Sequence, residues 1–328
     1  MNNPCLPESS TPIDNIPLLS EVLSIENSHS RNTERDKKLK QFLFQTSKIN
    51  FTPIPCFENK PGNYDYYVQE TLSHIIQLRK IKLNYALESS SLYDNMSFDV
   101  IERIASSDKK FALLDLDETL VHADFNDEFA DDEKIQYDTV ISFYSDCDNN
   151  LKDEENDMNT TSDDIKAEKS SKILNKVGVF LRPGLEKFLE EISKYFEIGI
   201  ITASVPEYAD AVLNYIDPEK KYFKIRLYRN NCVDICDLLR IKDLRILKKI
   251  NLKNVVLIDN NMYSFAPQLS NGILINSFYC DKTDCELSNV STYLINYIAA
   301  AEDVRKINEK FFGFKQIAED LAKNLKED

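Results

Sequence analysis

Short apolar runs that end in polar residues are the feature that most constrains the fold of this chain. FALLDLD at 111–117, EIGIITAS at 197–204 and NVVLIDN at 254–260 are short and almost continuously apolar before their polar ends. Runs of this kind are typical of parallel strands that are buried on both faces. GILINSFY at 272–279 has the same character. Because such strands must be covered by helices, the runs predict a layered α/β fold.

Segments with helical character lie between the apolar runs. LEKFLEEISKYF follows Pro183 and has a clear apolar stripe, and EYADAVLNYI at 207–216 predicts a second, shorter helix. FKIRLYR at 223–229 alternates and predicts an outer strand, whereas KDLRILKKI at 242–250 predicts a short helical or turn segment. Buried strands that alternate with helices predict a doubly wound, mainly parallel sheet.

An insertion interrupts this alternation. TVISFY at 139–144 and VGVFLRP at 177–183 predict two further strands. The residues between them, 145–171, contain DEEND and TTSDD and have the composition of a flexible acidic loop. We therefore predict a β-hairpin insertion at 138–180.

The predicted catalytic domain, 109–300, follows two segments of different character. Residues 1–60 are polar, contain scattered prolines and lack steady periodicity, which predicts a mostly disordered N-terminal extension. Residues 61–108 predict a helical extension, because apolar residues recur at helical spacing from Tyr64 to Leu87. This helix either packs on the domain or binds a partner.

The C-terminal segment, 301–328, predicts an amphipathic helix. Its apolar residues follow a heptad spacing from Val304 to Leu325, over fewer than four full heptads. We favour a helix that covers the domain's own surface, with a helper protein or a second copy as the alternative.

Charge, glycine content and hydropathy exclude several classes of protein. The net charge of −15, from 55 acidic and 40 basic residues, argues against direct nucleic-acid binding, which needs a basic face. The six glycines form neither GxGxxG nor GxxxxGK[ST], which excludes the common glycine-rich nucleotide loops. The first residues, MNNPCLPESSTPIDNIP, lack the apolar region of a signal peptide, and no stretch is apolar enough to span a bilayer. We expect no membrane association and a nuclear or cytoplasmic location.

Polar side chains gather where three predicted strands end. They are Asp115 and Asp117, Thr202 and Ser204, and Asp259 and Asn260. Ligands of open parallel sheets bind at the carboxyl ends of the strands, so we predict an active site at this edge.

The motif DLDET at 115–119 places two carboxylates on one face of a strand end, with one residue between them. Two like charges this close require a cation, and Mg²⁺ suits oxygen ligands. One carboxylate can then attack phosphorus while the other acts as general acid and base. An ordinary cap and turn is the alternative for an isolated DxDxT. The hydroxyl of Thr202, the charge of Lys242 and the amide oxygen of Asn260 favour phosphoryl transfer.

Several motifs together are similar to one phosphatase family. FALLDLDETLVH, RPGLEKFL, TAS followed by YAD, KDL and VVLIDNN resemble the FCP/SCP type of the haloacid dehalogenase (HAD) superfamily. These are the RNA polymerase II C-terminal-domain phosphatases and their small relatives. The resemblance covers roughly 109–300 and implies a HAD-like Rossmannoid fold. Most other branches have glycine where this chain has Glu118, and SFYCDKTDCEL at 277–287 is similar to the family's closing segment.

The resemblance also implies roles for individual residues. Asp115 would be the nucleophile and a Mg²⁺ ligand, and Asp117 would be the general acid and base and offer its backbone carbonyl to the metal. Thr119 would help to hold the loop and the phosphate. The remaining roles are phosphoryl binding by Thr202 and Lys242, metal binding by Asn260 with Asp259 in support, and structural or substrate contacts by Arg182. From its place at a predicted strand end, we also expect Ser204 to contact the substrate.

The function that the resemblance implies is a Mg²⁺-dependent protein serine/threonine phosphatase that works through an aspartyl-phosphate. Its substrate would be the RNA polymerase II C-terminal domain or another phosphoprotein. The acidic loop extends the family's usual hairpin, and no BRCT-like segment is evident, so the substrate stays open. The alternatives are a non-catalytic binding module of the same fold, similar to a mitochondrial translocase receptor, and a HAD phosphatase that acts on a small metabolite.

Overall fold

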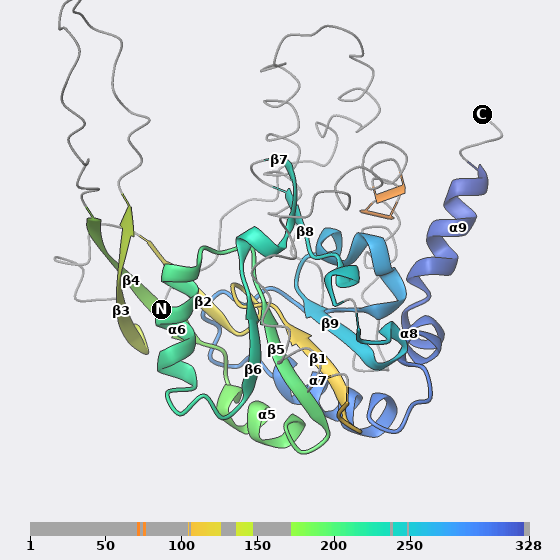
Figure 1. Cartoon of the computed structure of the whole chain (residues 1–328), viewed down its shortest axis with the longest axis horizontal. Coiled ribbons are helices and arrows are strands. Elements are labelled where there is room, and N and C mark those ends of the chain that lie inside the picture. Colours follow the sequence, from red (N-terminus) through yellow and green to blue (C-terminus); the bar gives the residue numbers. More distant parts are fainter. Residues whose placement is uncertain are drawn as a thin grey trace, which may run out of the picture.

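The structure is a computed structural model (Figure 1). It describes residues 71–72, 75–76, 104, 106–125, 136–146, 172–236, 239–247 and 249–324. The predicted disordered extension at 1–60, most of the helical extension at 61–108 and most of the acidic loop at 145–171 lie outside these residues.

A five-stranded, fully parallel sheet forms the centre of the domain. Its order is β10-β9-β1-β5-β6. The first strand, β1, is central, the next two in the chain lie on one side of it, and the last two lie on the other side. In the register, Leu114 of β1 lies opposite Ile200 of β5 and Ile258 of β9. This arrangement confirms the predicted doubly wound parallel sheet. The strands are β1 (Lys110–Leu114), β5 (Phe196–Ile201), β6 (Phe223–Leu227), β9 (Val255–Asp259) and β10 (Gly272–Leu274).

The two faces of the sheet are buried in two separate cores, which explains why its strands are continuously apolar. Ala112 and Leu114 of β1 contact one core, and Phe111 and Leu113 contact the other. Helices α5, α6, α7 and α8 cover the first core. Leu72, the α9 helix and two 3-10 segments belong to the second. The helices are α5 (Leu185–Ile192), α6 (Pro206–Ile216), α7 (Glu286–Tyr293, continued by a π turn at Leu294–Ile298), α8 (Val304–Phe312) and α9 (Phe314–Asn324), and the two 3-10 segments are Leu244–Ile246 and Met262–Asn271.

The insertion forms a second, antiparallel sheet with the order β2-β4-β3. Its hairpin, β3 (Thr139–Asp146) and β4 (Lys172–Leu181), confirms the predicted β-hairpin and contacts α6, beside which it projects in Figure 1. The strand β2 (Val121–Asp124) directly follows the DLDET motif and was not predicted. A small antiparallel pair, β7 (Val233–Cys236) and β8 (Leu239–Ile241), was not predicted either.

The C-terminal segment differs from the single amphipathic helix that we predicted for 301–328. Gly313, with φ +65°, ends α8 in the left-handed conformation that glycine adopts most easily, and α9 begins at the next residue. The heptad spacing continues across this break, which is why the sequence pattern suggests one helix. Phe314 and Ala318 of α9 lie in the second core, so this helix packs on its own domain. Within the described ranges, none of the helices has the length and apolar character needed to cross a membrane.

Candidate active site

The carboxyl ends of three neighbouring strands bring the predicted site residues together. Asp115 follows β1, and its backbone N–H donates to the carbonyl of Ile258 in β9 over 2.9 Å. Thr202 follows β5 and Asn260 follows β9. The parallel register therefore places these three residues at one edge of the sheet, as the sequence predicts.

Lys242 links two of the carboxylates. Its Nζ lies 2.5 Å from Asp115 Oδ1 and 2.6 Å from Asp259 Oδ2, and its side chain is 2% exposed. The backbone N–H of Lys242 donates to Ser264 and fixes the start of the side chain. Burial by itself would lower the pKa of Lys242, but the attraction of Asp115 and Asp259 raises it above its usual value. The lysine is therefore a fixed positive charge beside Asp115.

The hydroxyl of Thr119 lies between the second carboxylate oxygen of Asp115 and the amide oxygen of Asn260. Thr119 Oγ1 lies 3.1 Å from Asp115 Oδ2 and 3.4 Å from Asn260 Oδ1. The amide nitrogen of Asn260 donates to Ser277 Oγ over 3.0 Å, which turns the amide oxygen toward Asp115. Hard oxygen ligands from two strand ends thus lie close to one another.

This donor set fits Mg²⁺. The single charge of Lys242 neutralises only one of its two carboxylate partners. The site therefore keeps excess negative charge beside the oxygens of Asp115 and Asn260. A divalent cation with oxygen ligands suits that arrangement. In the part of the chain that the structure describes, no three His, Cys, Asp or Glu side chains form a metal cluster. The fit therefore rests on the carboxylate of Asp115 and the amide oxygen of Asn260.

Asp117 is held separately, by hydroxyl groups. Its Oδ2 accepts a hydrogen bond of 2.6 Å from Ser204 Oγ and a longer one of 3.4 Å from Thr202 Oγ1. Its Oδ1 accepts one of 2.6 Å from Tyr208. Burial, together with the nearby charge of Glu118, raises the pKa of Asp117 to about 6. Such a carboxyl group is suited to give and take a proton near neutral pH.

The backbone of the DLDET loop is tightly turned. Glu118 has φ +55°, in the left-handed region that glycine adopts most easily, and its N–H donates to Val121 over 2.7 Å. The carbonyl of Glu118 accepts a hydrogen bond of 2.7 Å from Phe278, which ties the loop to the segment after β10. His122 lies 3.4 Å from the Glu118 carboxylate and against the ring of Tyr279. These contacts stabilise a conformation that a non-glycine residue seldom adopts.

Arg182, predicted to make structural or substrate contacts, supports the loop from within the protein. It is 1% exposed, and its Nε and Nη2 donate to the carboxylate of Asp284 over 2.9 and 2.7 Å. Its Nη1 donates to the carbonyl of Thr119 over 3.0 Å. The ion pair with Asp284, 102 positions away in the chain, turns this arginine into a support for the DLDET backbone.

Asp259, predicted to support the metal site, lies beside Lys242. Its Oδ2 accepts a hydrogen bond from Lys242, and its Oδ1 accepts one of 2.8 Å from the backbone N–H of Asn261. Asp259 therefore helps to hold Lys242 next to Asp115.

Two residues of the site, Tyr208 and Ser277, have no role predicted from the sequence. Tyr208 lies in the first turn of α6, a helix that starts four residues after Thr202. Its place could have suggested a role in the site, because a hydroxyl in the first turn of a helix that follows a polar strand end lies near that end. Ser277 lies in the SFYC segment that carried part of the family resemblance, but its contact with Asn260 needs the folded chain.

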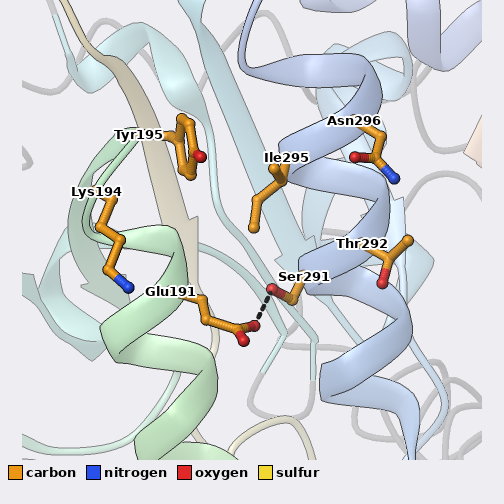
Figure 2. A pocket seen from close by; sticks show the side chains of 7 residues that line it. All are labelled: Glu191, Lys194, Tyr195, Ser291, Thr292, Ile295 and Asn296. Atoms are coloured by element: carbon orange, nitrogen blue, oxygen red, sulfur yellow. Dashed lines mark hydrogen bonds between the residues drawn. The ribbon is translucent and has the colours of Figure 1, made fainter.

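A hollow of about 270 Å³ lies elsewhere, between α5 and α7 (Figure 2). Glu191 and Ser291 form a hydrogen bond of 2.9 Å across it. Lys194 and Tyr195 also line it, and they directly precede β5. The hollow is therefore at the amino end of that strand, away from the edge that carries Thr202.

The comparison with family models decides the identity of the domain. Residues 110–305 match the model of the NLI interacting factor-like phosphatases. The chain belongs to this family. The match includes all the site residues described above, from Asp115 to Ser277, which supports the resemblance to FCP/SCP-type phosphatases.

Curated phosphatases are similar to part of this chain. CTD small phosphatase-like protein 2 of Dictyostelium discoideum is 43% identical over 139 residues, which are 42% of this chain and 24% of that protein. CTD small phosphatase-like protein 3 of Caenorhabditis elegans is 41% identical over 135 residues, 41% of this chain and 46% of that protein. The chain thus spans less than half of the length of each of these relatives. A fission yeast RNA polymerase II CTD phosphatase, Fcp1, bound to beryllium fluoride is 21% identical, with a TM-score of 0.38, and covers 65% of this chain and 57% of that one.

Proposed function

We propose that this member of the phosphatase family is a Mg²⁺-dependent protein serine/threonine phosphatase that forms an aspartyl-phosphate on Asp115. The observation that carries the proposal is the setting of the Asp115 carboxylate. It accepts hydrogen bonds from Lys242 and Thr119 at the carboxyl edge of the sheet, next to the amide oxygen of Asn260. A carboxylate held between a fixed positive charge and hard oxygen ligands is equipped for attack on phosphorus.

In the first half of the proposed reaction, an oxygen of Asp115 bonds to the phosphorus of the substrate. The bond between phosphorus and the serine or threonine oxygen breaks, and its electron pair stays on that oxygen. Protonated Asp117 transfers its proton to this oxygen, so that a neutral alcohol leaves. Lys242 supplies positive charge beside the transferred group.

In the second half, a water molecule attacks the phosphorus of the aspartyl-phosphate. The carboxylate of Asp117 accepts a proton from this water, and the bond between phosphorus and Asp115 breaks. Inorganic phosphate leaves, and both carboxyl groups return to their starting protonation states. The raised pKa of Asp117, about 6, supports its part in both halves.

Mg²⁺ would be held by the carboxylate of Asp115, the backbone carbonyl of Asp117 and the amide oxygen of Asn260. When bound, it would neutralise phosphate oxygens during transfer. Thr119 keeps the first and the last of these ligands together through its hydroxyl. Thr202 and Ser204, which we predicted as substrate contacts, instead act on the Asp117 carboxyl in this account.

A protein substrate is supported by the form of the insertion. Within the residues that the structure describes, β3 and β4 form a two-stranded hairpin that contacts α6, and such a hairpin favours an extended peptide over a small metabolite as substrate. The names of the relatives, CTD small phosphatase-like proteins, favour the RNA polymerase II C-terminal domain or another phosphoprotein as substrate. A nuclear or cytoplasmic location stays a prediction.

The test is a phosphate-release assay on the full chain with MgCl₂. Phosphoserine and phosphothreonine peptides are compared with sugar phosphates, and Asp115→Asn is compared with Asp303→Asn, a distant helix-cap variant. We expect turnover of the peptides, its loss in Asp115→Asn and its retention in Asp303→Asn. A complete absence of turnover would favour the binding-module alternative, and turnover of sugar phosphates alone would favour a metabolite phosphatase.

A further inference from the structure

Tyr208 makes the least expected contact in the site. Its hydroxyl donates to Asp117 Oδ1 over 2.6 Å, while Ser204 donates to Oδ2 over the same distance. The two carboxyl oxygens are therefore held by two hydroxyls, one from the turn before α6 and one from its first turn. Hydrogen bonds to both oxygens restrict the rotation of the Asp117 carboxyl group about its terminal bond.

The ring of Tyr208 is itself fixed by the insertion. The residue is 2% exposed, and its ring centroid lies 5.3 Å from that of Phe125 and 5.6 Å from that of Phe143. Phe125 directly follows β2, and Phe143 lies on β3 of the hairpin. Tyr208 thus joins three parts of the domain: the DLDET loop, α6 and the inserted sheet.

The phenol stays a hydrogen-bond donor. Burial and the charge of Asp117 raise the pKa of Tyr208 above its usual value. The tyrosine therefore remains protonated over the whole range in which a carboxyl group exchanges its proton. It cannot take over the proton transfer itself, but it can hold the group that does so.

We propose that Tyr208 is a positioning residue for proton transfer to the leaving oxygen: its hydroxyl, braced by the rings of Phe125 and Phe143, aligns the carboxyl group of Asp117. This inference rests on the proposed phosphatase function. Tyr208 does not bond to the substrate in this account. Its contribution is confined to the step in which the proton of Asp117 moves to the serine or threonine oxygen as the bond to phosphorus breaks.

Because Tyr208 acts only in this proton transfer, its loss should affect substrates with different leaving groups differently. An alkoxide is a poor leaving group and needs a proton as it departs, whereas a nitrophenolate leaves without one. The ratio kcat/KM reports all steps up to the departure of the alcohol and none after it. A residue that only stabilises the fold lowers kcat/KM for both kinds of substrate alike, while a residue that aligns the acid lowers it for the alkyl phosphate.

The experiment measures kcat/KM of the full chain with Mg²⁺, using a phosphoserine peptide and p-nitrophenyl phosphate. Tyr208→Phe removes one oxygen and keeps the ring. Tyr228→Phe is the matched control, because Tyr228 also donates to an aspartate, Asp210, over 2.7 Å. Asp210 lies two positions after Tyr208 on α6 and therefore on a different face of that helix. We expect Tyr208→Phe to lose about 10- to 100-fold on the peptide and less than about 3-fold on the aryl phosphate. Tyr228→Phe should match the wild type on both.

Equal losses on the two substrates, or no loss on the peptide, would overturn the inference while leaving the proposed function intact. An inactive wild type would instead overturn the proposed function. A double variant separates this role from a folding defect. With p-nitrophenyl phosphate, adding Tyr208→Phe to Asp117→Asn should lower kcat/KM by less than about 2-fold, because the carboxyl group that Tyr208 aligns is already absent. A further large loss in the double variant would show that Tyr208 acts in another way.

Discussion

Lys242 Nζ lies 2.5 Å from Asp115 Oδ1, in a part of the domain where both side chains are almost fully buried. The same ammonium group lies 2.6 Å from Asp259, so one positive charge serves two carboxylates that come from different strands. In the proposed reaction, this pairing places a fixed positive charge beside the transferred phosphoryl group. It also means that the site contributes to the stability of the fold.

Replacement of Lys242 by methionine should therefore destabilise the domain as well as inactivate it. The change leaves two buried carboxylates without their counter-ion, and breaking a buried pair in this way costs about 3–5 kcal/mol. Urea unfolding at neutral pH measures the loss. The double variant Lys242→Met/Asp259→Asn should recover part of it, because one of the uncompensated charges is removed. An unchanged unfolding midpoint in Lys242→Met would contradict the pairing.

Arg182→Ala should lower the stability of the domain and its activity together, because the DLDET backbone loses its support. The buried guanidinium supports the carbonyl of Thr119 and pairs with Asp284, so its removal should cost about 3 kcal/mol or more. Arg305→Ala is the control, because Arg305 forms an exposed pair with Asp303 and should change the free energy of unfolding by less than about 1 kcal/mol. Equal effects of the two variants would argue against a supporting role for Arg182.

Ser277→Ala should weaken metal binding. Ser277 accepts a hydrogen bond from the amide nitrogen of Asn260, and loss of such an orienting contact typically lowers metal affinity about 10- to 100-fold. Mn²⁺ binding, followed by electron paramagnetic resonance, measures affinity directly and needs no turnover. Ser291→Ala, which breaks the hydrogen bond to Glu191 in the remote hollow, should bind Mn²⁺ as the wild type does. Unaltered affinity in Ser277→Ala would remove Asn260 from the proposed ligand set.

The dependence of activity on pH should follow Asp117. Its pKa is raised from 3.8 to about 6, so the acid form persists to a higher pH than in an ordinary aspartate. Because departure of the alcohol needs that proton, kcat/KM for a phosphoserine peptide should fall as the pH rises through about 6. The raised pKa of Lys242 adds no loss in this range. The same profile with p-nitrophenyl phosphate should lack the fall, and a peptide profile that is flat to about pH 8 would contradict the assignment.

The central part of the site could be predicted because strand ends are visible in the sequence. Asp115, Thr202 and Asn260 each follow a short apolar run, and the parallel order of the strands brings them to one edge. The helix break at Gly313 was not predicted, since the apolar spacing continues on both sides of it.

The contacts that surround these residues could not be predicted in the same way. Tyr208 and Asp117 are 91 positions apart, and Arg182 and Asp284 are 102 positions apart. Spacing along the chain carries no information on such pairs. The sequence therefore leaves open whether Arg182 makes structural or substrate contacts, and the fold shows that it is buried in an ion pair with Asp284.

The most direct test of the account is to trap the phosphorylated enzyme. The full chain is mixed with a phosphoserine peptide and Mg²⁺, quenched in acid during turnover and treated with borohydride, which reduces an acyl phosphate to the alcohol. Peptide mass spectrometry then locates the product. We expect homoserine at position 115 in the wild type, dependent on substrate, with Asp117 and Asp259 unchanged. Steady turnover by an enzyme whose Asp115 is never modified, or modification at another carboxylate, would contradict it.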